Sequence, residues 1–159
     1  MHKKIGIIGG MSPESTITYY KHITHQYTKR FGDHSYPPVL IYSVSFQDYI
    51  DWPNTGRWDL IAEGLSEAAK SLQAAGADVI LIATNTMHIV FDEVQAALSV
   101  PVISLLDVVG EAIQQKGISK VGLLGRLRWC VRLRSLRRSP VYSLRKGRCR
   151  SNQEVQRRS

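Results

Sequence analysis

A chain of 159 residues fits one domain, and its net charge of +8 would suggest a nucleic-acid or anionic-surface partner if that charge were evenly spread. It is not evenly spread. Residues 1–125 carry nine Lys/Arg against twelve Asp/Glu, whereas residues 126–159 carry twelve Lys/Arg and one acid, Glu154. The first part is therefore mildly acidic, and its charge excludes the inference that it binds nucleic acid.

The composition indicates neither a disulfide framework nor a membrane anchor. Both cysteines, Cys130 and Cys149, lie in the basic segment. No apolar run approaches the ~20 residues of a membrane helix, and the run after Lys4 is too short for a signal peptide. We expect a soluble cytoplasmic protein with no membrane partner.

Short apolar runs alternate with amphipathic segments along residues 1–125. Residues 4–9 read as a buried strand, after which Ser12 suits a helix N-cap and Pro13 the first helical position. The helix should extend to about residue 30 and bury one face, made of Ile17, Tyr20, Thr24, Tyr27 and Phe31. The further expected elements are a strand at 39–44, a polar and aromatic loop at 46–56, a helix from 58 to a stop at Gly76, a strand at 78–83, a helix ending near 98, a strand at 101–104, a helix at 105–116 and a strand at 120–124.

Five strands alternating with four helices predict an α/β fold with a parallel sheet and helices on both faces. Right-handed crossovers place every loop that follows a strand at one edge, where parallel sheets bind ligands. The loops expected at that edge are residues 9–13, 45–56, 84–88 and 104–107.

The first of these loops joins a strand to a helix start. Its free backbone N–H groups and the helix dipole would suit a carboxylate or phosphate, and a tight turn with a cap explains the same residues equally well. The glycines Gly9 and Gly10 do not have the spacing of a dinucleotide fingerprint.

A polar cluster, Thr84-Asn85-Thr86, ends an apolar strand at the same edge. Hydroxyl and amide groups there could hold a carboxylate and place one hydroxyl over a substrate carbon. The spacing alone slightly favours the simpler interpretation that Asn85 or Thr86 caps the next helix. His88 could face Thr84 one turn later, but a hydrogen-bonded structural histidine is the favoured interpretation.

Two further groups of residues carry weaker signals. The 46–56 loop could close over a ligand, although nothing in it specifies chemistry. His22, His25 and His34 lack metal-ligand spacing with any carboxylate and read as a solvated face, so no metal is expected.

Two strings together resemble the aspartate/glutamate racemase family of cofactor-independent amino-acid racemases: residues 7–16, IIGGMSPEST, and residues 84–88, TNTMH. Segments 42–46 and 56–59 are also similar, and the resemblance spans about residues 4–125. It implies two similar α/β lobes facing each other across a cleft, no cofactor, and a small acidic amino acid as substrate. It also implies a two-base mechanism, with one residue from each lobe on opposite faces of the α-carbon.

The resemblance also implies roles for individual residues. Thr84 stands where most of the family has Cys, as in the branch that pairs a first-lobe Thr with a second-lobe Cys, and it would be the catalytic residue of this lobe. Asn85 and Thr86 would hold the α-carboxylate, Met11 and Ser12 would shape one wall, and Asn54, in the 46–55 loop, would approach the side-chain carboxylate. A homodimer is among the partners that we consider.

The basic segment departs from this pattern. The expected domains are a first racemase lobe at 1–119, the first strand of a truncated second lobe at 120–125, which echoes residues 4–9, and an irregular or disordered tail at 126–159. The resemblance implies a second lobe in which a Gly-Cys-Thr-Glu string bears the second catalytic residue, and residues 126–159 contain no such string. We therefore expect a frameshifted tail, and a chain that is inactive or impaired as a racemase. The alternatives are a non-catalytic anion- or nucleic-acid-binding α/β protein with a basic arm, or an unstable remnant.

Overall fold

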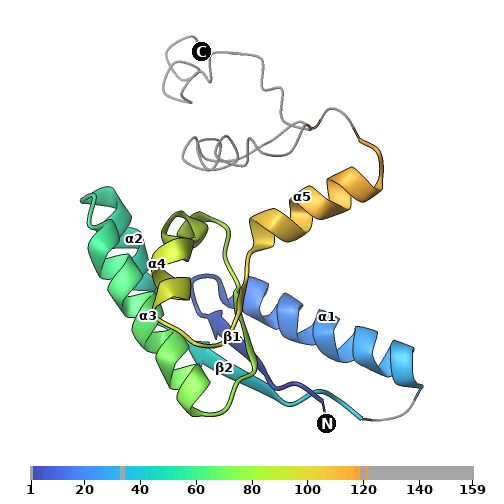
Figure 1. The fold of residues 1–159 in the computed structure, drawn as a ribbon. Helices are drawn as coiled ribbons and strands as arrows, with labels where there is room; N and C mark the ends of the chain where they lie inside the picture. The colour runs from blue at the N-terminus through green and yellow to red at the C-terminus, as the bar shows by residue number, and fades with distance from the viewer. Residues whose placement is uncertain (1, 33–34, 119–120, 122–159) are drawn as a thin grey trace, which may run out of the picture. The chain divides into compact units, whose positions relative to one another are not determined.

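The computed structural model describes residues 2–32, 35–118 and 121. The chain divides into two compact units, residues 1–109 and 110–159, with the boundary inside the last described helix. The first unit contains a four-stranded parallel sheet in the order β2-β1-β3-β4, which confirms the predicted α/β fold (Figure 1). Its strands are β1 (Ile5–Gly9), β2 (Val39–Ser43), β3 (Val79–Ile82) and β4 (Val102–Ile103). The predicted strand at 120–124 and the basic segment lie outside the described residues, apart from Val121.

The helices lie on both faces of this sheet. Figure 1 shows α3 and α4 on one side of the strands and α1 on the other. The helical elements are α1 (Pro13–Phe31), α2 (Phe46–Asn54), α3 (Trp58–Ala74), the 3-10 helix η1 (Thr86–Val90), α4 (Phe91–Ala96) and α5 (Leu105–Gln115). Of the second unit, the described part is the end of α5, where Gly117 adopts a positive φ of 63° and its N–H bonds the carbonyl of Gln114.

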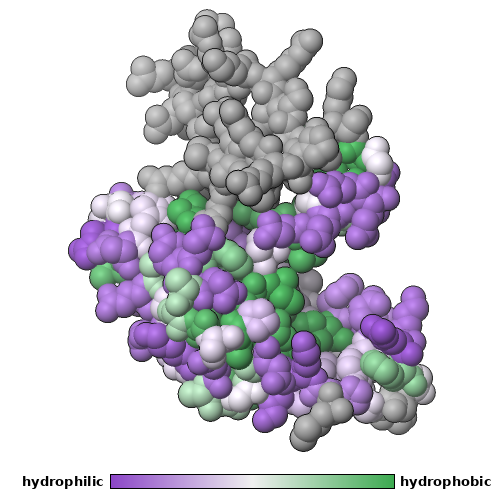
Figure 2. Space-filling model, in the orientation of Figure 1, coloured by the Kyte–Doolittle hydropathy of each residue, from purple (hydrophilic) through white to green (hydrophobic). Residues whose placement is uncertain are grey.

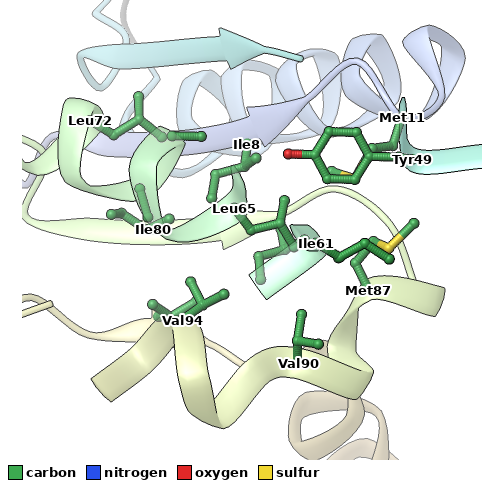
Figure 3. Close-up of a cluster of buried hydrophobic side chains, with 14 of the residues drawn as sticks. Ile8, Met11, Tyr49, Ile61, Leu65, Leu72, Ile80, Met87, Val90 and Val94 are labelled. Atoms are coloured by element: carbon green, nitrogen blue, oxygen red, sulfur yellow. The ribbon is translucent and has the colours of Figure 1, made fainter. Parts of the chain in front are cut away.

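The main core lies between the sheet and α3 (Figure 3). Ile8 and Ile80 project from neighbouring strands and pack with Leu65 and Leu72 of α3, and all four are at most 4% exposed. Each fully buried side chain of this size contributes about 1.5–3 kcal/mol. Gly6 belongs to the same face, where a Cβ would lie 3.3 Å from the Cβ of Leu72, so the absence of a side chain lets α3 approach β1.

The opposite face carries a cross-strand apolar row. The register aligns Ile41, Ile7, Leu81 and Ile103 across β2, β1, β3 and β4. Ile7 is fully buried, but Ile41 is 45% and Ile103 40% exposed at the two ends. Figure 2 accordingly shows apolar surface bordered by hydrophilic side chains.

Helix α1 begins and ends close to where the sequence predicts, but it presents a different face to the sheet. Ile17 and Tyr20, predicted to be buried, are 53% and 45% exposed, whereas Thr16 is buried. The Thr16 hydroxyl accepts a hydrogen bond from Gly10 N–H at 3.1 Å and donates one to the Ser12 carbonyl at 3.1 Å. These bonds fix the rotation of the helix about its axis, because they require Thr16 to point at the strand end.

The predicted loop at 46–56 is instead largely helix α2. Tyr49 and Trp52, one helical turn apart, pack edge to face with ring centroids 5.3 Å apart, and Tyr49 is 5% exposed. This buried aromatic pair outweighs the polar composition of the segment, and the helix ends after Pro53. The third predicted helix also differs, since it begins as η1 and becomes α-helical only at Phe91.

The loops that follow β1, β2 and β3 leave the sheet side by side. Val44 N–H bonds the carbonyl of Gly9 at 3.0 Å, and Ala83 N–H bonds the carbonyl of Ile8 at 2.9 Å. The sheet hydrogen bonds thus continue one residue past the strands, and they hold the turn after β1 between its two neighbours.

Candidate active site

A small pocket of about 260 Å³ lies where the turn after β3 meets the first turns of α1. Its lining consists of Ser15 and Tyr19 from α1 and the run 83–86 from the end of β3. The structure therefore brings together three of the predicted site residues, Thr84, Asn85 and Thr86. A wider groove of about 680 Å³ is lined by outward-facing residues of α1, including His22 and His25, but it contains none of the residues that follow a strand.

The polar side chains of the turn after β3 are not used by the fold. Asn85 stands at the cap position of η1, but its φ and ψ of −80° and −44° are helical and its side chain makes no capping bond. Within the described part of the chain, the side chains of Thr84, Asn85 and Thr86 have no hydrogen-bond partner. The expectation that Asn85 or Thr86 is a helix cap is therefore wrong, and their hydrogen-bonding groups line the pocket instead.

The turn after β1 has the opposite character. Ser12 caps α1 by accepting the N–H of Ser15 at 3.3 Å, and the Ser15 hydroxyl donates to the same oxygen at 3.2 Å. The Ser12 hydroxyl in turn donates to the Glu14 carboxylate at 3.1 Å. These bonds support the interpretation of this turn as a tight turn with a cap, and Ser12 is not among the residues that line the pocket.

Two other predicted site residues also lie away from the pocket lining. Met11 is 3% exposed and belongs to the core with Tyr49 and Met87 (Figure 3), so its side chain supports the turn from below. Asn54 is exposed at the C-terminal end of α2. The predicted loop is therefore helical at Asn54, and the expectation that Asn54 approaches the side-chain carboxylate stays a prediction.

Ser15 and Tyr19 are polar pocket residues that the predicted site did not include. Tyr19 lies one helical turn after Ser15, so the two share a face of α1, and its half-buried ring lines the pocket. Burial raises the pKa of the Tyr19 hydroxyl above its usual value of 10, so this group, like an ordinary tyrosine, is a protonated hydrogen-bond donor at neutral pH. The i, i+4 spacing from Ser15 was the available signal, but the apolar pattern of α1 pointed to another face.

His88 is buried at 1% exposure directly behind the pocket. Its Nδ1 lies 2.9 Å from the carbonyl oxygen of Thr84, and its Nε2 accepts the N–H of Leu105 at 3.0 Å. Both ring nitrogens therefore bond to the main chain, as the structural interpretation expects. Neither nitrogen is placed to take a proton from the Thr84 hydroxyl.

The described residues contain neither a cluster of metal-ligand side chains nor a membrane-spanning helix. No group of three or more His, Cys, Asp or Glu side chains within them is arranged to hold a metal ion. None of their helices is long and apolar enough to cross a membrane.

The first unit is of the parallel α/β class, and its hydroxyl- and amide-lined pocket lies at the carboxyl edge of the sheet, where proteins of this class bind ligands. Residues 8–134 match the model of the Asp/Glu/Hydantoin racemase family. The chain belongs to this family. The match extends nine residues beyond Gly125, the point at which the composition changes.

The alignments with individual relatives cover most of this chain but only part of each relative. The chain is 34% identical over 114 residues to the broad specificity amino-acid racemase RacX of Bacillus subtilis, an alignment that covers 70% of this chain and 48% of RacX. The chain thus spans about half the length of this curated relative.

Solved structures agree with this partial coverage. A crystal structure of a putative Asp/Glu racemase from Yersinia pestis is 38% identical with a TM-score of 0.79, and the match covers 85% of this chain and 61% of that one. An aspartate racemase homologue from Pyrococcus horikoshii OT3 is 40% identical with a TM-score of 0.72, over 84% and 61% of the two chains. The aspartate racemase of Picrophilus torridus, at 23% identity and a TM-score of 0.66, shares the fold.

Proposed function

We propose that this chain provides the first lobe of a cofactor-independent amino-acid racemase that acts on aspartate or glutamate. In this proposal Asn85 and Thr86 hold the α-carboxylate of the substrate, and Thr84 handles the proton on one face of the α-carbon. The observation that carries the proposal is the set of hydrogen-bonding side chains at 84–86 that the fold leaves unused, in a chain of this family.

The pocket chemistry supports carboxylate binding. Four hydroxyl-bearing residues and one amide line it, namely Ser15, Tyr19, Thr84, Thr86 and Asn85. Hydroxyl and amide donors can bond a carboxylate oxygen, and fixed donors of this kind stabilise the negative charge that develops when an α-proton is removed. A neutral Tyr19 hydroxyl adds a donor on the α1 side.

Thr84 is a weak candidate base by itself. A hydroxyl is a much poorer proton acceptor than a thiolate at neutral pH, and it needs a neighbouring base to become effective. His88 does not supply that base, because main-chain groups occupy both of its ring nitrogens. We therefore propose the Thr-for-Cys branch of the family for this chain, with unequal rates for the two enantiomers and faster turnover of L-substrates.

Inversion of a stereocentre requires one group to remove the proton and another to return it from the opposite face. In this proposal Thr84 is one of these two groups. The aligned part of the chain corresponds to 48% of the length of RacX. We therefore expect the 159-residue chain to bind the substrate but to racemise it slowly.

Proton exchange in heavy water tests this proposal. The purified chain is incubated with L- or D-aspartate and L- or D-glutamate in heavy water, and loss of the α-proton is followed by NMR. Binding is followed in a parallel sample in ordinary water, where the amide shifts at 84–86 are observable. We expect saturable shifts at these amides with slow exchange, and a weakening of binding in Asn85→Ala. Exposed Gln47→Ala on α2 serves as the matched control.

Two results would contradict the proposal in different ways. Absence of any shift at residues 84–86 at millimolar amino acid would remove the substrate site. Formation of the opposite enantiomer at the rate of a complete racemase would show that the chain already holds both proton-handling groups, because inversion requires delivery of the proton on the second face.

A further inference from the structure

We propose that His88 is the positioning residue of the pocket: it holds the Thr84 backbone through one defined neutral tautomer and ties the turn after β3 to the turn after β4. This role rests on the proposed function only in so far as Thr84–Thr86 bind the substrate. The tie itself follows from the two hydrogen bonds of a buried ring.

The partners of the ring determine its tautomer. A carbonyl oxygen can only accept, so the contact of 2.9 Å to Thr84 requires the proton on Nδ1. A main-chain N–H can only donate, so the contact of 3.0 Å from Leu105 requires a bare Nε2. The ring is therefore neutral and carries its proton on Nδ1.

The packing around the ring fixes its plane. His88 is 1% exposed, and its ring stacks on Phe91 with an interplanar angle of 8° and a centroid distance of 5.8 Å. The main-chain N–H of His88 also bonds the Asn85 carbonyl at 3.2 Å. One residue thus holds the carbonyls of both Thr84 and Asn85, which are two of the residues that line the pocket.

The second bond links the pocket to a distant segment. Leu105 is the first residue of α5, 17 positions after His88, and it follows the carboxyl end of β4. Two loops that the sheet alone places at the same edge are thereby joined by a side chain. A shift in either loop would move the Thr84 carbonyl, and with it the hydroxyl over the pocket.

A pair of variants separates the two bonds. The amide nitrogen of Asn occupies about the place of Nδ1, so His88→Asn keeps a donor for Thr84 and loses the acceptor for Leu105. The amide oxygen of Gln occupies about the place of Nε2, so His88→Gln keeps that acceptor and loses the donor. Each variant removes one main-chain bond, which makes them matched controls for general destabilisation.

The experiment combines ¹⁵N NMR of the imidazole in the unmodified full chain with aspartate and glutamate titrations of both variants, alongside their melting temperatures. We expect a protonated Nδ1 and an unprotonated Nε2. We also expect His88→Gln to weaken amino-acid binding about fivefold, the effect of one hydrogen bond, and His88→Asn to keep it within about twofold at a similar melting temperature.

The other outcomes either overturn the positioning role of His88 or separate it from the proposed function. A proton on Nε2, or binding that falls in parallel with melting temperature in both variants, would overturn the positioning role. If the unmodified chain binds neither amino acid, the proposed function fails, but the tie is still judged by the tautomer and by exchange of the Leu105 amide. That amide should stay protected in His88→Gln and lose protection in His88→Asn, and the reverse would refute the tie.

Discussion

The turn after β1 and the turn after β3 lie on adjacent strands, but they use their polar side chains in opposite ways. In the first, Ser12, Ser15 and Thr16 bond one another and the backbone. In the second, the side chains at 84–86 make no hydrogen bond among the described residues, and only the buried His88 behind them is engaged. Polar groups that the fold leaves unused can bond a ligand without breaking an internal hydrogen bond, so the second turn is the one suited to binding.

The largest effect is expected at Gly10, at the centre of the turn after β1. Its φ of 91° disfavours any L side chain, and a Cβ there would overlap the backbone of Val44. Gly10→Ala should lower the free energy of unfolding by more than about 3 kcal/mol, measured by urea denaturation. Gly56→Ala is a control, because its φ is also positive at 76° but a Cβ there meets nothing within 4 Å. Equal losses in both would show that backbone conformation alone, and not the close approach to β2, makes glycine necessary.

A smaller loss is expected from Thr16→Val, which keeps the shape of the side chain but removes its hydroxyl. The buried N–H of Gly10 would then lose its partner, at a cost of about 1–3 kcal/mol in urea denaturation. Thr18→Val is the matched control, since the Thr18 hydroxyl donates only to an exposed carbonyl, that of Glu14, at 2.8 Å. A loss at Thr18 as large as at Thr16 would mean that helix propensity, and not the turn, accounts for the effect.

The two cap positions provide a direct comparison between the turns. Ser12→Ala removes a side chain that accepts the Ser15 N–H, and it should cost about 1 kcal/mol of unfolding free energy. The measurement is again the denaturation midpoint at constant m-value. An unchanged free energy of unfolding would contradict the interpretation that the polar side chains of the turn after β1 stabilise the fold.

The smallest change in stability is expected from Asn85→Ala at the corresponding position of η1. Its side chain makes no capping bond, so unfolding should change by less than about 0.5 kcal/mol. Amino-acid binding, followed by the amide shifts at 84–86, should weaken in the same variant. A stability loss comparable to that of Ser12→Ala would restore the capping role and remove the distinction between the two turns.

Local sequence patterns located most of the elements of this lobe. Apolar runs marked the strands, Ser12 and Pro13 marked the start of α1, and the crossover rules placed the loops that follow the strands at one edge of the sheet. The carboxyl-edge position of Thr84 was also predictable, because the end of an apolar strand in a parallel sheet defines that edge. Helix α2 was missed because the burial of Tyr49 against α3 is a tertiary contact that the composition of the segment does not reveal.

The sequence by itself determined where the chain alternates between strand and helix, and which polar cluster follows β3, because both depend on residues a few positions apart. Only the tertiary structure decided which face of α1 meets the sheet, that Tyr19 joins the pocket, and that His88 spans 17 residues to reach Leu105. Those outcomes depend on hydrogen bonds and packing between segments that become neighbours only when the sheet has formed. The same is true of the contrast between the turns after β1 and after β3, since a side-chain hydroxyl forms a hydrogen bond only where the folded chain brings a partner within reach.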